Sequence, residues 1–300
     1  MIVEVPSRPA VRHDGFTRFA WVVLAFNILV VLWGAFVRAS GSGAGCGDHW
    51  PLCDGEVVPQ SPTAHKLIEF THRATSGIDV VLVGILLVWA FRKFSKGSPV
   101  RLGAVLATIF LVSEALIGAG LVLLQRVAKN ASGYWSTAHQ LNTLALLGSV
   151  ALTVWWSTGR RRLTARSPHL TTVLVSLSAV ALLAVSGVIA ALGNTLFPAE
   201  SLAHGLAQDL DPASSIFLRL RIFHPAIALC TAVWLLYVAT QAGRRAWTVV
   251  GILGAQLVLG LVNLLLLAPV WAQISHLLLA DLLWVSLVFL SAELLEAPAD

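Results

Sequence analysis

The feature that most constrains this chain is the recurrence of apolar segments close to 20 residues long. Four of them cover residues 19–37, 102–124, 170–192 and 247–267, and Asn27 is the one clearly polar residue of the first. A helix of ~20 apolar residues crosses the hydrocarbon core of a bilayer. It also satisfies its own backbone hydrogen bonds there. The pattern therefore predicts a helical protein that crosses a membrane several times.

The composition agrees with a membrane protein. Only 12% of the residues are charged and the mean hydropathy is +0.81, whereas soluble domains carry roughly 25% charged residues. The net charge of +5 would suit a nucleic-acid partner, but the basic residues cluster in short connectors between apolar runs. Membrane orientation explains that distribution better. We expect no cleavable signal, because the first apolar run is long enough to serve as a signal-anchor.

We expect an all-α integral membrane fold with eight transmembrane helices arranged as two tandem four-helix bundles. The predicted spans are 19–38, 65–91, 102–124, 134–156, 170–192, 217–240, 246–267 and 272–291. They divide the chain into an N-terminal segment (1–18), a first half (19–156), a basic linker (157–169), a second half (170–291) and a tail (292–300).

Charge predicts the orientation. Eight spans place both termini on one side, and that side would hold 13 Lys and Arg residues against 7 on the other. Because cytoplasmic segments carry the excess of basic residues, we expect both termini in the cytoplasm and the protein in the plasma membrane. The long segments 39–64 and 193–216 would then lie outside.

The order of features in the first half repeats in the second. Gly34 and Gly187 lie near the ends of the first and fifth spans, and the third and seventh spans carry glycines that include Gly118 and Gly260. Each half then has a long outer loop and two helices that carry a histidine. Parallel repeats of this kind also occur in transporters, so the repeat alone does not choose a function.

Four of the nine histidines fall in the even-numbered spans: His72, His139, His224 and His276. All four spans run inward, and each histidine follows the start of its span by four to seven residues, which at ~1.5 Å per residue is a common depth of roughly 6–11 Å. Ionisable groups inside membrane helices are costly and usually functional. A porphyrin iron accepts one imidazole on each face, so the pattern favours two hemes, one in each half. It favours zinc less, because zinc sites often have tight local spacing such as HxxxH.

The residues beside these histidines differ between the halves. Glu69, His72, Ser76 and Asp79 share one helical face, so Glu69 could transfer protons or orient an imidazole. A salt bridge to Arg73, four residues on, is the structural alternative. In the sixth span, Arg219 and Arg221 precede His224. A guanidinium is suited to anchoring a heme propionate, although these arginines could equally extend to the membrane interface.

The first outer loop carries two cysteines, Cys46 and Cys53. On the oxidising side of the membrane such a pair is typical of a disulfide. A clip on the loop and a redox-active pair both remain open.

These residues resemble the bacterial heme A synthases. The resemblance rests on the loop Gly41-Ser-Gly-Ala-Gly-Cys46 through Trp50-Pro-Leu-Cys53 and on Glu69-Phe-Thr-His72-Arg73, followed by Gly77. The other three histidines fall in the expected helices, so the likeness covers nearly the whole chain. Glu114 departs from the family, where a neutral amide is expected, and the third span therefore takes no role from the resemblance.

The resemblance implies an enzyme that oxidises the ring methyl of heme O to the formyl group of heme A by two successive hydroxylations. It implies heme b as cofactor, ligated by His224 and His276, and substrate heme flanked by His72 and His139, with Glu69 as the essential acid. The resemblance thus implies heme O as the substrate and a heme O synthase as a further partner. It does not identify the electron donor. The alternative functions are a non-catalytic diheme cytochrome b that exchanges electrons with quinone, and a transporter.

Overall fold

The computed structural model describes residues 14–60, 62–123 and 132–298, and the described chain is helical almost throughout. The long helices are α1 (Gly15–Ala39), α2 (Ala64–Lys93), α3 (Pro99–Leu123), α4 (Ser132–Ser157), α5 (Leu170–Leu196), α8 (Phe223–Ala242), α9 (Trp247–Leu265) and α10 (Val270–Leu295). Three short elements join them: α6 (Leu202–Leu210), α7 (Ile216–Arg221) and the 3₁₀ turn η1 (Gly243–Ala246). Most of the predicted N-terminal segment, residues 1–13, lies outside the described residues.

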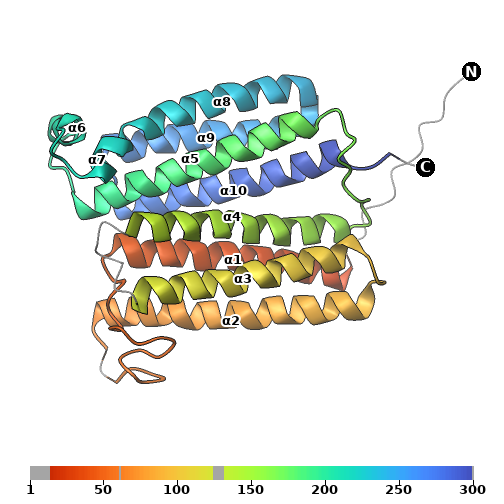
Figure 1. Cartoon of the computed structure of the whole chain (residues 1–300), viewed down its shortest axis with the longest axis horizontal. Helices are drawn as coiled ribbons and strands as arrows, with labels where there is room; N and C mark the ends of the chain where they lie inside the picture. Colours follow the sequence, from red (N-terminus) through yellow and green to blue (C-terminus); the bar gives the residue numbers. More distant parts are fainter. Residues whose placement is uncertain (1–13, 61, 124–131, 299–300) are drawn as a thin grey trace, which may run out of the picture.

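The long helices pack side by side in two groups of four (Figure 1). In the first group, α1 to α4 each contact the next helix in the chain, and α4 also contacts α1, so the four helices form a closed bundle. In the second group, α5, α8, α9 and α10 contact one another in the same order, and α10 also contacts α5. The groups meet where α1 and α4 pack on α5 and α10. The core runs through this junction, and its fully buried members include Leu147 and Val150 of α4 and Leu283 and Leu287 of α10.

Polar contacts join the packed helices at both ends of the molecule. At one end, Ser157 of α4 donates to the hydroxyl of Thr17 in α1 (3.0 Å). At the opposite end, Arg38 of α1 donates to Ala191 O (3.1 Å) and to Thr195 Oγ1 (3.0 Å) of α5, and so ties the first group to the second. Both arrangements satisfy polar groups that would otherwise be costly to bury.

The two ends differ in charge. The end that holds the start of α1 and the ends of α4 and α10 carries 11 of the 16 Lys and Arg residues that the structure describes, and the end with the long loops carries the other five. We call these the basic end and the loop end. In Figure 1 the loop end, with α6 and α7, lies on the left.

Six stretches of the described residues are long and apolar enough to cross a membrane by length and composition. Five are α1, α2, α3, α5 and α10, and the sixth is the 50-residue stretch Ile216–Leu265. The fold divides that stretch at η1 into α8 and α9. The predicted count of eight spans is therefore not established by apolar length alone, although the helical membrane class is.

The predicted span 217–240 is interrupted near its start. The structure ends α7 at Arg221 and begins α8 at Phe223. Pro225 explains the break, because it has no N–H to donate to the carbonyl of residue 221 and its ring clashes with that carbonyl in a regular helix. His224 therefore lies in the first turn of α8.

Candidate functional site

The four intramembrane histidines lie at one level on four helices. His72, His139 and His276 are the eighth, seventh and sixth residues after the starts of α2, α4 and α10, and His224 is the eighth after the start of α7. At ~1.5 Å per residue, all four lie about 9–12 Å below the helix starts, on the loop-end side. All are half-buried. The common depth predicted from the sequence is therefore present.

The histidines also associate in pairs within each half. His72 lies close enough to His139, and His224 to His276, for the charge on one ring to act on the other. Among the described residues, no group of three or more His, Cys, Asp and Glu side chains comes together as a metal cluster would. Paired imidazoles without further ligands match the donor set of a heme iron with two axial histidines.

Each histidine ring faces a glycine of the preceding long helix, a feature that the sequence reasoning missed. We describe each contact by the distance from the ring to a Cβ added to the glycine. This distance is 2.9 Å from Gly34 of α1 to His72 Cε1 and 3.0 Å from Gly260 of α9 to His276 Cε1. It is 3.3 Å from Gly187 of α5 to His224 Cε1. The fourth pair is looser, with Gly118 of α3 at 3.9 Å from His139 Nε2. The repeated glycines noted in the sequence were the available signal.

The imidazole nitrogens have different partners. His139 Nδ1 lies 2.7 Å from Glu114 Oε1 and His224 Nδ1 lies 2.9 Å from Ser186 Oγ. The Nδ1 atoms of His72 and His276 are buried and have no hydrogen-bond partner. Buried polar atoms without partners are rare and call for an explanation. Each half thus contains one histidine whose Nδ1 has no protein partner and two imidazoles that lie against glycines, and such a donor set fits a heme iron with two axial histidines.

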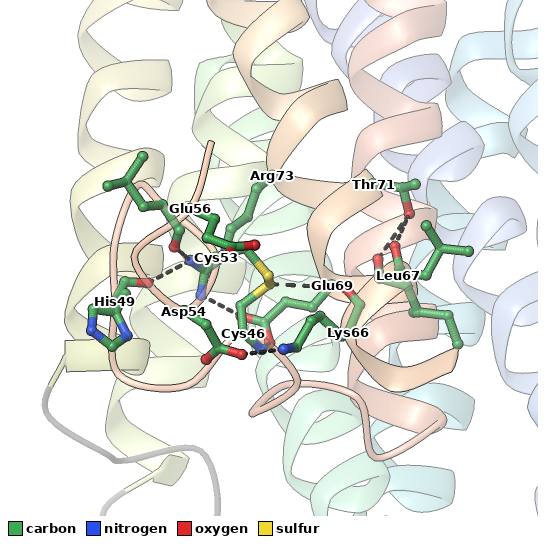
Figure 2. Close-up of a disulfide and its surroundings, with 12 residues drawn as sticks. Cys46, His49, Cys53, Asp54, Glu56, Lys66, Leu67, Glu69, Thr71 and Arg73 are labelled. Atoms are coloured by element: carbon green, nitrogen blue, oxygen red, sulfur yellow. Dashed lines mark hydrogen bonds and ion pairs between the residues drawn. A yellow bond between two sulfur atoms is a disulfide. The ribbon is translucent and has the colours of Figure 1, made fainter. Parts of the chain in front are cut away.

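Glu69 occupies the most constrained position beside these histidines. Its side chain is buried, with the residue only 3% exposed. The backbone N–H of Cys46 donates to Glu69 Oε2 (2.9 Å), and Arg73 Nη2 donates to Glu69 Oε1 (2.5 Å). Arg73 also donates to the carbonyls of His49 and Leu52 in the loop. Figure 2 shows the carboxylate enclosed between the loop and α2. The salt bridge considered as an alternative is thus present, and the carboxylate has a loop partner as well.

The loop that covers Glu69 is held in place at several points. Cys46 and Cys53 form the expected disulfide. Gly45 packs so closely on the start of α2 that an added Cβ would lie 2.5 Å from His65 O. Asp54 pairs with Lys66 of α2, and this hydrogen bond holds the pKa of the Asp54 carboxyl below its usual value. The loop is therefore fixed to the same helix that carries Glu69 and His72.

The matching position of the second half carries the opposite charge. Arg221, three residues before His224 as Glu69 is before His72, donates to Asp209 Oδ1 (2.6 Å) and to Asn194 Oδ1 (2.7 Å). It thereby anchors α6 and the outer loop. Arg219 donates to Pro212 O (3.2 Å) at the surface. Both arginines contact protein groups, and anchoring of propionates by them stays a prediction.

The remaining intramembrane acids are buried. Asp79 accepts a hydrogen bond from Asn27 Nδ2 of α1 (2.9 Å). Asp281 is 1% exposed and its Oδ2 has no partner.

The chain is similar in sequence to several known proteins. The family model COX15-CtaA, described as cytochrome oxidase assembly protein, matches residues 17–288. A protein of Thermus thermophilus named protoheme IX farnesyltransferase is 44% identical over 94% of this chain and 48% of its own length. Proteins named heme A synthase are 40% identical in Halalkalibacterium halodurans (46% of this chain, 47% of that protein) and 37% identical in Shouchella clausii (37% of each). The matches with the Thermus and Halalkalibacterium proteins span about half of those proteins' length.

Proposed function

Since the chain belongs to the COX15-CtaA family of cytochrome oxidase assembly proteins, we propose that it is a heme A synthase, an oxidoreductase that converts the ring methyl of heme O to a formyl group. The observation that carries the proposal is the set of level, paired histidines, each beside a glycine, with a buried carboxylate next to one pair only. The names of the relatives in Halalkalibacterium and Shouchella support it.

We assign the substrate heme to the first half, between His72 and His139. The methyl carbon is oxidised twice: in each hydroxylation a C–H bond is broken, a C–O bond forms, and two electrons leave the carbon for an oxidant that the chain does not contain and that must be supplied from outside, giving an alcohol and then a gem-diol. Loss of water from the gem-diol leaves the aldehyde. Glu69 accepts a proton released from the methyl or hydroxyl group in these steps. Arg73 and the Cys46 N–H keep its two oxygens oriented while the loop limits access of water.

The second half lacks a carboxylate at the position of Glu69 and holds the cofactor. We propose that His224 and His276 ligate heme b, which supplies a one-electron redox centre when bound. Ser186, at 2.9 Å from His224 Nδ1, orients that ring so that Nε2 is free for iron. Arg219 and Arg221 lie at the outer edge of this half and would be the residues to hold the heme propionates.

A heme-extraction experiment tests the proposal. The chain is expressed in a host that makes heme O but no heme A, and the extracted hemes are separated by chromatography and identified by mass. Hydroxylated or formylated heme supports the enzyme. Heme b alone, with a bis-histidine spectrum, would instead indicate a diheme cytochrome b, and a chain without heme would favour a transporter.

Glu69→Gln is the matched variant for that experiment. It keeps the shape of the side chain but removes the charge, so we expect the heme b spectrum to persist while oxidised heme disappears. Oxidised heme at the wild-type level would make Glu69 a structural residue that holds Arg73 and the loop.

We further propose the orientation in the plasma membrane. All eight long helices span it, in halves covering 19–156 and 170–291, with both termini and the basic end in the cytoplasm. Cysteine substitution at Ser95 in the α2–α3 connector and at Val57 in the outer loop, followed by labelling of intact cells with an impermeant thiol reagent, tests this. Labelling should occur at position 57 and not at position 95.

A heme farnesyltransferase is the partner we propose. The Thermus relative carries that name, is about twice as long as its match and resembles nearly all of this chain in one half. An enzyme that attaches the farnesyl group supplies heme O, so direct transfer would keep an apolar substrate out of water. Co-purification from membranes that express both proteins, at detergent levels that keep each folded, tests the contact.

A further inference from the structure

Glu114 of α3 has no role in the proposed reaction, yet a cluster of side chains from α4 holds it. Its Oε1 lies 2.7 Å from His139 Nδ1 and also accepts from Thr143 Oγ1. Its Oε2 accepts from Asn142 Nδ2 at 2.6 Å. Asn142 is itself fixed by Phe110 O (2.7 Å) and by Ser113 Oγ (2.6 Å). Both carboxylate oxygens are therefore occupied, and Oε1 faces the Nδ1 edge of the His139 imidazole.

The second half has an amide in the same register. Glu114 lies four residues before Gly118, which faces His139, and Gln256 lies four residues before Gly260, which faces His276. Gln256 Nε2 is 3.4 Å from His276 Nε2. Leu279 and Ala280 stand where the first half has Asn142 and Thr143. The carboxylate and the residues that hold it thus belong to the first half only.

We propose that Glu114 is a positioning residue that makes His139 a stronger iron ligand than His276, and so makes the first half the more electron-rich heme site. The inference rests on the proposed function, because it takes His139 to bind heme iron. It goes beyond that function in assigning the two sites different affinities for oxidised heme.

The charge of Glu114 and the tautomer that it selects in His139 both affect a bound heme iron. A carboxylate that accepts from Nδ1–H leaves Nε2 unprotonated and directed to the metal, and it raises the basicity of the ring. Two neutral imidazoles leave a ferric porphyrin core with one positive charge that the ferrous core lacks. An anion one imidazole away stabilises that charge in a medium of low dielectric constant. Glu114 therefore favours the ferric over the ferrous heme, and a neutral amide does not.

The test uses the full chain loaded with ferric protoheme at both sites. Electron paramagnetic resonance and a spectroelectrochemical titration follow the two low-spin hemes, and the signal that disappears in His139→Ala identifies the first site. Glu114→Gln keeps the size of the side chain and removes its charge. Gln256→Glu adds a carboxylate beside the second pair of histidines, on the Nε2 side of His276, whereas Glu114 lies on the Nδ1 side of His139.

In Glu114→Gln we expect ferric heme to bind the first site about 10–100-fold more weakly, as is typical when a partner of a ligating histidine is lost. With ferrous binding unchanged, each tenfold loss raises the midpoint potential of that heme by about 59 mV. The second heme should not change. Gln256→Glu should lower the potential of the second heme and leave the first unchanged.

An unchanged potential and resonance spectrum in Glu114→Gln, with heme still bound, would overturn the inference and leave Glu114 as a structural anchor for α4. That result would not touch the proposed reaction, whose failure is the absence of oxidised heme in the extraction experiment. A chain that binds no heme at the first site would overturn both.

Discussion

Replacement of Gly45 by alanine should uncouple the outer loop from Glu69 without touching any side chain of the site. Gly45 lies directly against the first turn of α2. A Cβ at this position would be 2.5 Å from His65 O, 2.6 Å from His65 C and 2.8 Å from Lys66 N. All three atoms belong to the helix backbone, so the helix cannot yield as a flexible side chain would, and the loop must move.

The size of the movement follows from these distances. Ordinary contact begins near 3.4 Å, so the loop at residue 45 must retreat by about 0.9 Å. The next residue donates the 2.9 Å hydrogen bond from Cys46 N to Glu69 Oε2, and the same displacement would stretch it to about 3.8 Å, where it no longer counts as a hydrogen bond. A hydrogen bond to a charged group contributes roughly 1.5–3 kcal/mol. If that orientation is needed in the transition state, turnover falls on the order of 10–150-fold.

The assay is formation of oxidised heme from heme O by Gly45→Ala, measured beside the heme b spectrum of the same preparation. The spectrum should be unchanged, because His224 and His276 lie in the other half. Gly84→Ala, on α2 where an added Cβ meets nothing within 4 Å, is the control and should match the wild-type chain in both measurements. Wild-type turnover in Gly45→Ala, with the loop displaced, would refute the claim that the Cys46 N–H orients Glu69.

Three further predictions concern the ligands, the glycines and the loop. His276→Ala should lose the heme b absorbance, and an unchanged spectrum would remove His276 from the ligand set. Gly34→Ala would place a Cβ 2.9 Å from His72 Cε1, so it should destabilise the first half by about 1–3 kcal/mol in thermal unfolding. Gly118→Ala would place a Cβ 3.9 Å from His139 and should be tolerated. Equal destabilisation by the two variants would contradict the explanation from packing. The lowered pKa of Asp54 means that its contact with Lys66 is intact above the usual aspartate pKa of about 3.9 and is lost as the pH falls through the lower folded value. The protection factors of the amides of residues 46–56, which correct for the intrinsic pH dependence of exchange, should therefore fall on acidification in the wild-type chain but not in Lys66→Ala.

The sequence alone determined the class of protein and predicted which residues form the candidate site. Apolar length predicts membrane helices because the bilayer thickness is fixed, and this physical constraint needs no tertiary information. The common depth of the four histidines follows from helix rise in the same way. The break between α7 and α8 also has a local cause, because Pro225 cannot donate a backbone hydrogen bond to residue 221.

The number of membrane spans and the hydrogen-bond partners of the charged residues were harder to predict from the sequence. The stretch Ile216–Leu265 is continuous in apolar character, and only the turn at η1 separates α8 from α9. A salt bridge between Glu69 and Arg73 was the structural alternative that the sequence offered, because the two residues lie four apart on one helix. The contribution of Cys46 N could not be foreseen, since it depends on how a loop of irregular backbone folds over α2.

What only the tertiary structure decided is which helix faces which ring. The sequence pattern gives the height of His139 along α4 and the face of α4 on which it lies. Glu114 and Gly118 approach His139 from α3, and the rotation of α3 about its own axis is set by packing. The same holds for the glycines opposite the other three histidines. Local sequence specifies helix rise and periodicity, whereas contacts between helices depend on the simultaneous fit of many side chains, and the chemical difference between the two halves arises in those contacts.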